Sequence, residues 1–194
     1  MNVSRPLFMI AGAMLLAVST YAQRIKVTEG KLSVLEGQKE INIEYSYDNM
    51  RVGKFDKEEE YIKSRTEELN KKEPGRGDQW AKAWVADRKQ RFEPKFDELF
   101  SKTSGMQLDK NAKYTIIFNT VFTEPGFNVV VHRKNAYIDG EVTIVETADK
   151  SKVVAKATID NSPGKSVWGN DYDTGERISE AYAKAGKELA KKVK

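Results

Sequence analysis

The chain contains no cysteine and a single histidine, His132, among its 194 residues. Without thiols it has no disulfide, no zinc ribbon, no iron–sulfur cluster and no cysteine nucleophile, and one imidazole leaves little for a metal site or a catalytic triad. The glycines are isolated, so no phosphate-binding loop, dinucleotide-binding pattern or serine elbow is present. The sequence therefore excludes most familiar catalytic constellations, although its composition is ordinary for a globular protein, with 39% hydrophobic and 32% charged residues.

Long apolar runs are also scarce, and the main one covers residues 7–18. Thr20 and Ala22 follow at the positions that signal peptidase inspects, so residues 1–22 are predicted to be a signal peptide that is cleaved after Ala22. A retained membrane anchor is the alternative, but the run is too short to span a hydrocarbon core of roughly 30 Å comfortably. We therefore expect residues 23–194 to be a single exported domain, periplasmic or secreted in a Gram-negative bacterium. The absence of cysteine fits an exported bacterial protein better than a eukaryotic secreted one.

The basic excess is small and lies at one end of the chain. The formal net charge is +4, and from Glu176 onward six basic residues stand against three acidic ones. Lysines in the last turns of a helix complement its dipole, whereas a nucleic-acid surface needs basic side chains spread over a face with aromatic residues between them. The sequence therefore predicts no nucleic-acid partner and no transmembrane segment after signal cleavage. The predicted partner is an unidentified envelope protein or glycan.

Hydrophobic periodicity divides the mature chain into four parts. Residues 24–48 alternate between apolar and polar side chains, with a turn at Gly37, and are predicted to form a hairpin. Residues 56–102 are highly charged and show helical spacing. Residues 113–159 return to β periodicity, and a final amphipathic helix follows Asp173.

The helical part carries recognisable start signals and a tryptophan pair. Asp56 and Glu59 have the spacing of a capping box, and Asp78 is placed to cap a second helix. Trp80 and Trp84 would lie on the inner face of that second helix. An aromatic platform for sugar rings is one interpretation of the pair, but a spacing of four on a helix favours core packing.

The second β part is predicted to be an antiparallel meander of four strands. Its first strand, which begins near Lys113, has apolar residues on both sides and is expected to be central. The hairpin has too few strands to be stable alone, so we expect it to join the same sheet. The predicted fold class is α+β, an antiparallel sheet of about six strands with helices on one face, the 56–102 segment as a helical insertion and a C-terminal helix.

The C-terminal part resembles a known group of proteins. The residues that carry the likeness are TEPGFNVVVHRKNAYIDGEVTIVETADKSKVVAKATI and DYDTGERISEAYAKAGKELAKKVK, with Gly175, Arg177, Tyr182 and Gly186 in the final helix as the clearest element. They resemble a family of secreted or periplasmic proteins of Bacteroidetes-type bacteria, a domain of unknown function. The resemblance implies export and a similar fold, and it carries no catalytic residue across.

Asp171 and Asp173 lie in a loop with the oxygen ligands that a hard cation such as calcium prefers. The loop lacks the third acidic or amide position and the distal glutamate of an EF-hand, so capping of the final helix is the favoured interpretation. We predict no metal and no cofactor.

The remaining candidates are weak binding residues. Trp168 lies in a polar, glycine-rich loop, where a bulky aromatic either closes the sheet end or contacts a partner. His132 and Arg133 are adjacent in a predicted strand, and a surface role for the histidine is favoured because no second histidine or cysteine exists.

The favoured functional hypothesis is an exported, non-catalytic binding or accessory module of the cell envelope, with no catalytic residue assigned. One alternative is a carboxylate-based glycan hydrolase, which needs two acids about 5 to 9 Å apart in an open cleft. The other is a small-ligand carrier with an apolar cavity between sheet and helices. A free strand edge or an apolar patch would instead favour a protein partner.

Overall fold

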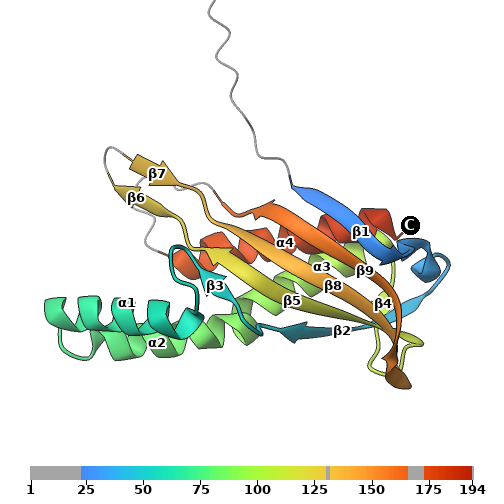
Figure 1. Cartoon of the computed structure of the whole chain (residues 1–194), viewed down its shortest axis with the longest axis horizontal. Helices are drawn as coiled ribbons and strands as arrows, with labels where there is room; N and C mark the ends of the chain where they lie inside the picture. Colours follow the sequence, from blue (N-terminus) through green and yellow to red (C-terminus); the bar gives the residue numbers. More distant parts are fainter. Residues whose placement is uncertain (1–22, 130–131, 166–172, 194) are drawn as a thin grey trace, which may run out of the picture.

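The computed structural model describes residues 23–129, 132–165 and 173–193 and shows an α+β fold built on a mixed sheet of seven strands (Figure 1). The strands of this sheet are β1 (Arg24–Gly30), β2 (Glu40–Ser46), β3 (Arg51–Val52), β4 (Gln107–Leu108), β5 (Tyr114–Glu124), β8 (Tyr137–Glu146) and β9 (Asp149–Pro163). A separate two-stranded sheet comprises β6 (Phe127–Val129) and β7 (His132–Lys134). The helical elements are the 3-10 turn η1 (Leu32–Leu35), α1 (Glu58–Lys72), α2 (Arg76–Asp87), the π-helical turn η2 (Arg88–Phe92), α3 (Glu93–Ser104) and α4 (Thr174–Lys192).

The strand order is β1-β9-β8-β5-β2-β4, and β3 pairs with β5 beyond the end of β2. The predicted hairpin of residues 24–48 is therefore wrong, because β1 and β2 do not pair and lie toward opposite borders of the sheet (Figure 1). Between them η1 buries Leu32 and Leu35 in the core, which gives the intervening segment a packing role of its own. Both strands nevertheless belong to one sheet with the later strands, as expected.

The sheet is mixed rather than antiparallel throughout. β2 runs parallel to β5, with Tyr45 opposite Phe118, and also parallel to β4. Parallel neighbours require a crossover between them, and residues 56–104, which lie between β2 and β5 in the sequence, supply it with helices. The antiparallel expectation was wrong here because the helical insertion carries the chain back to the end of the sheet where β2 begins. β5 therefore starts at that end and runs in the same direction as β2.

The second β part forms a meander of β5, β8 and β9, with β5 inside the sheet between β8 and β2, as its two-sided apolar pattern predicts. The expected fourth strand is absent from this meander. Residues 127–129 and 132–134 instead form the paired strands β6 and β7, which leave the main sheet after a turn at Gly126 with φ 70°.

The helical insertion consists of a hairpin of α1 and α2, followed by α3. Glu58 begins α1 after Lys57, so the expected capping box at Asp56 does not form. α2 begins at Arg76, two residues before the expected cap at Asp78. The helix N-cap is Gly75, whose φ of 84° is accessible to glycine at little cost.

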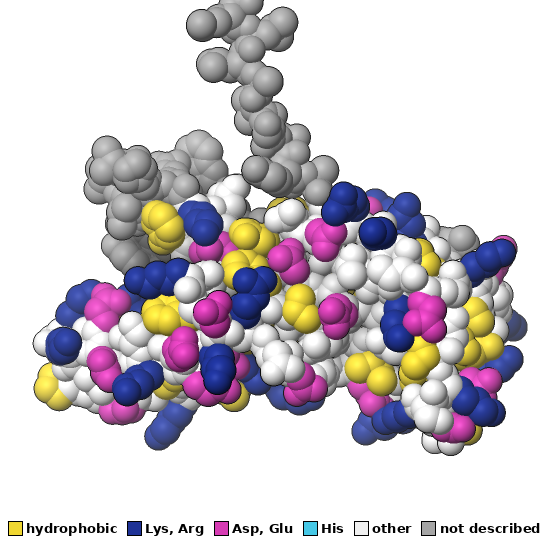
Figure 2. Space-filling model, viewed as in Figure 1, with side chains coloured by type: hydrophobic (Ala, Val, Ile, Leu, Met, Phe, Trp, Pro, Cys, Tyr) yellow, Lys and Arg dark blue, Asp and Glu magenta, His cyan; other side chains and the backbone are white. Residues whose placement is uncertain are grey.

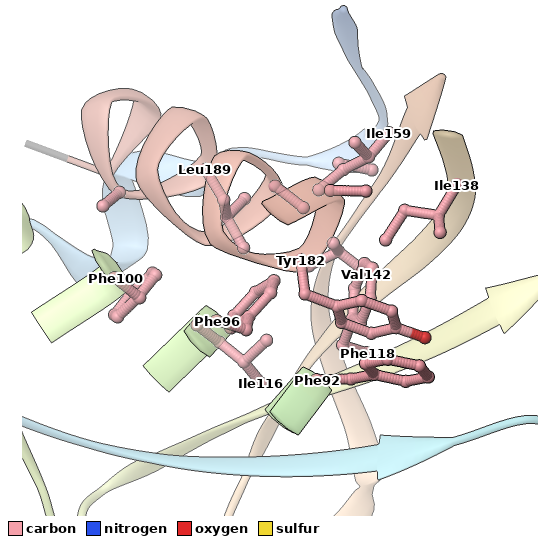
Figure 3. Close-up of a cluster of buried hydrophobic side chains, with 14 of the residues drawn as sticks. Phe92, Phe96, Phe100, Ile116, Phe118, Ile138, Val142, Ile159, Tyr182 and Leu189 are labelled. Atoms are coloured by element: carbon pink, nitrogen blue, oxygen red, sulfur yellow. The ribbon is translucent and has the colours of Figure 1, made fainter. Parts of the chain in front are cut away.

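α3 and α4 pack against one face of the sheet and enclose the core (Figures 1 and 3). Phe92 stacks on Tyr182 with a centroid distance of 5.1 Å, and the buried Phe96 lies against Phe118. The predicted apolar face of α4 is confirmed, since the residues expected there are all buried: Ile178, Ala181, Tyr182, Ala185 and Leu189. The small Ala155 and Ala157 on β9 are buried beneath it.

The opposite face of the sheet carries interspersed acidic, basic and polar side chains (Figure 2). Ion pairs join its strands: Glu29 of β1 pairs with Lys156 of the adjacent β9 at 2.8 Å, and Glu44 of β2 pairs with Lys150 at the start of β9 at 2.7 Å. Because these pairs are solvent-exposed, they contribute little to stability and indicate a wet surface. Among the described helices, none is sufficiently long and apolar to cross a membrane.

Candidate functional site

The sequence-predicted candidates are not brought together into one described site. Trp168 and Asp171 lie outside the described residues. The backbones of His132 and Arg133 belong to β7, opposite Val129 and Asn128 on β6. Their roles in binding remain predictions.

Asp173 has a structural role at the start of α4. Its carboxylate accepts hydrogen bonds from the backbone N–H of Glu176 at 3.0 Å and from Arg91 at 2.7 Å. Burial acts to raise the pKa of Asp173, but the Arg91 guanidinium and the helix N–H groups outweigh it and lower that pKa. The helix-cap interpretation is therefore confirmed for this residue.

The tryptophan pair lies in an aromatic group at the base of the α1–α2 hairpin. Trp84 is buried and Trp80 half-buried, and both rings contact Tyr61, with centroid distances of 5.1 and 5.6 Å. This arrangement supports core packing, because Tyr61 meets Trp80 edge-on and Trp84 at a tilt, so the three rings do not form one flat platform.

Buried polar groups gather where η2 interrupts the long helix formed by α2 and α3. Arg88 forms an ion pair with Glu58, and the indole N–H of Trp84 donates to the same carboxylate at 2.6 Å. The Arg88 guanidinium also lies over the ring of Tyr47, 4.0 Å from its centroid. π-helical turns are frequent at functional sites, which makes this group the strongest candidate for a site that sequence reasoning missed.

A second part of the same group joins β2 to α3. The Tyr45 hydroxyl donates to Asp97 at 2.5 Å, and the Tyr47 hydroxyl donates to Glu93, which also pairs with Lys89 at 2.8 Å. Burial raises the pKa of Asp97, while the hydrogen bond from Tyr45 opposes that rise. Glu93 and Asp97 are four residues apart on one helix, a spacing that was visible in the sequence. Their tyrosine partners were not, because they depend on β2 running beside α3. We call these seven residues the polar cluster: Tyr45, Tyr47, Glu58, Arg88, Lys89, Glu93 and Asp97.

The cavity beside the polar cluster is very small. It has a volume of about 10 Å³ and is lined by Tyr47, Glu58, Trp84, Arg88 and Tyr182, among others. That space holds about one water molecule, for which Tyr47, Glu58 and Arg88 offer hydrogen-bonding groups in an otherwise largely apolar lining. One carboxylate faces it, and the space is too small for the ligand of a carrier or for the substrate of a hydrolase.

A larger groove of about 390 Å³ lies at one end of the sheet. It is formed by the segment that precedes β5 and by the turn between β8 and β9, with Lys110, Lys113 and Glu146 as its charged residues. A single carboxylate lines it, so the acid pair of a glycosidase is not assembled there. Within the described ranges, no group of three metal-ligating side chains occurs.

The free edge of β2 offers a different kind of site. Gln107 N–H donates to the carbonyl of Lys39 at 2.8 Å, and Asp109 N–H donates to that of Ile41 at 3.0 Å, so these carbonyls point away from β5. Backbone groups alternate sides along a strand, and the N–H and C=O of Ile43 and Tyr45 therefore also point outward. β4 ends before it reaches them, and no described residue forms a hydrogen bond with these four groups. We call residues 43–46 the β2 lane.

Comparison with known proteins adds little to this. No family model matches the chain, and no curated protein matches it. Two dodecamer structures of PelC from Paraburkholderia phytofirmans, one of them a single-residue variant, show a distant structural likeness. The variant aligns with a TM-score of 0.39 and the other with 0.38, each at 11% identity over 87% of this chain and 98% of that chain. We take no functional conclusion from a likeness of this degree.

Proposed function

We propose that this protein is an exported, non-catalytic binding module of the bacterial cell envelope that engages another polypeptide through its sheet. The observation that carries the proposal is the β2 lane, which presents four backbone hydrogen-bonding groups without partners among the described residues. Unpaired strand edges are the surfaces on which proteins add a strand from a partner.

The arrangement of the polar cluster supports a binding role over catalysis. Its carboxylates are engaged by neighbouring side chains: Glu58 by Arg88 and Trp84, Glu93 by Lys89 and Tyr47, and Asp97 by Tyr45. Mutually satisfied groups around a space of one water stabilise a fold and leave no room for a reacting substrate. We therefore assign the cluster the role of holding β2 against the long helix.

Export makes a direct prediction about the mature chain. We expect cells that express the full gene to process it after Ala22, so that the protein in the periplasmic fraction begins at Gln23, immediately before β1. N-terminal sequencing and intact-mass measurement of the fractionated protein test this. A cytoplasmic, unprocessed chain, or one that keeps residues 1–22 in the membrane fraction, would contradict the proposed location.

A further inference from the structure

The β2 lane constrains the strand that can fill it. Ile43 and Tyr45 direct their side chains toward the helix layer and are half-buried, so a partner strand needs apolar residues on that side. On the other side, residues 40–50 contain the acids Glu40, Glu44 and Asp48 and no basic residue. Glu44 pairs with Lys150 of β9 at 2.7 Å but keeps 40% of its side chain exposed, so a basic residue of the partner strand would share this carboxylate with Lys150. The matching strand therefore alternates apolar and basic side chains.

β1, at the other border of the same sheet, has this composition. Residues 24–27 read Arg-Ile-Lys-Val. Ile25 and Val27 lie opposite Ile159 and Ala157 on the helix-covered side. Val27 is 43% exposed, a large fraction for an apolar side chain. Lys26 lies opposite Thr158 on the wet face and forms no ion pair with a described residue.

The topology also determines how these two borders would meet. Counted across the sheet, β9 is antiparallel to β1 and to β8, β5 is antiparallel to β8, and β2 is parallel to β5. β1 and β2 of one molecule therefore run in opposite directions. A second copy that continues the sheet with its helices on the same side must then place its β1 antiparallel to β2.

From this match we propose that the β2 lane binds β1 of a second copy of this chain, in a head-to-tail contact that extends the sheet from one molecule to the next. In the antiparallel register, Lys26 of one copy faces Glu44 of the other, while Val27 and Ile25 face Ile43 and Tyr45. The inference rests on the proposed binding role and names its partner, and it does not depend on export.

The same features disfavour the symmetric alternatives. Pairing of two β1 strands would gather their basic residues, and the bulge between Val27 and Glu29 limits the length over which they pair. Pairing of two β2 strands would gather their acidic residues. A head-to-tail contact uses different surfaces on the two molecules, so it closes into a ring or continues as a filament.

The experiment is sedimentation velocity on the processed protein at concentrations from about 1 to about 100 µM, at about 50 and about 500 mM NaCl. We expect concentration-dependent assembly that weakens with salt. Lys26→Glu is expected to weaken association by about tenfold or more, because it places like charges opposite one another, and so is the paired variant Glu44→Lys/Lys150→Glu, which keeps the ion pair within the molecule with reversed polarity. The triple variant Lys26→Glu/Glu44→Lys/Lys150→Glu restores opposite charges across the contact and is expected to assemble again. Lys63→Glu, on the exposed surface of α1, is the matched charge control and should assemble like wild type.

Circular dichroism melts confirm that each variant is folded before it is scored. A wild-type monomer at every concentration would overturn the inference, as would normal assembly of Lys26→Glu or of Glu44→Lys/Lys150→Glu, or a folded triple variant that stays dissociated. Failure of self-association would not by itself defeat the proposed function. A monomeric protein can still be processed and exported, and binding of another polypeptide to the β2 lane can be measured independently.

Discussion

Leu189→Ala is expected to lower the free energy of unfolding by about 3 kcal/mol. Leu189 is fully buried on α4, and removal of its side chain leaves a cavity between α4 and its neighbours in the core. For a chain of this size the corresponding fall in Tm is roughly 6 to 12 °C. Thermal and urea melts of the purified protein measure the change.

The matched control for this prediction lies on the same helix. Lys187 and Lys191 are exposed, and the ion pair of Lys191 with Glu188 is on the surface. Replacement of both lysines by glutamine is expected to alter stability by well under about 1 kcal/mol. If the leucine variant melted like wild type while the lysine variant lost stability, α4 would not be the element that closes the core.

Glu58→Gln is expected to cost about 2 to 3 kcal/mol, although the substitution is nearly isosteric. The amide oxygen can still accept from the Trp84 indole, but the Arg88 guanidinium loses its anionic partner in a site where its side chain is only 20% exposed. A cation left without its partner in such a place is the main cause of the loss. Chemical denaturation gives the free energy directly.

Glu59→Gln is the control for this substitution, because Glu59 occupies the next position of α1 and is exposed. We expect its effect to stay within about 0.5 kcal/mol. Equal stabilities for the two variants would show that the polar cluster does not hold β2 and the helices together, and its interpretation as a structural network would fail.

Several elements could be predicted from the sequence because their signals are local. The apolar stripe of α4 and its cap at Asp173 are properties of one helix and were found correctly. The two-sided apolar pattern of β5 likewise reports burial on both faces, which only an inner strand experiences.

Strand pairing was harder to predict from the sequence. Alternation of apolar and polar residues indicates that a segment is a strand, but it does not indicate which strand it pairs with. β1 and β2 are adjacent in the sequence, yet β9 pairs with β1 and β5 pairs with β2. The direction of β2 follows from the helical crossover, whose effect on the sheet is a property of the whole chain. The β2 lane exists only because β4 is two residues long, a length that no periodicity indicates.

The contacts of the polar cluster could not be predicted from the sequence for the same reason. Glu93 and Asp97 are spaced for one helix face, but their partners Tyr45, on β2, and Tyr47, just after it, lie about fifty residues earlier in the chain. The candidates chosen from local composition, Trp168 and Asp171, belong to a segment outside the described residues. Sequence reasoning found the residue types that carry charge and hydrogen bonds, and the fold decided which of them meet.

That this protein acts through a free sheet edge is tested most directly by amide hydrogen exchange along β2 in the monomeric protein, followed by NMR. The Ile43 and Tyr45 amides point into the empty lane, whereas those of Asn42 and Glu44 face β5, so we expect Ile43 and Tyr45 to exchange at least about tenfold faster. Uniformly slow exchange at all four positions would mean that the edge is already covered, and it would contradict the binding role proposed for it.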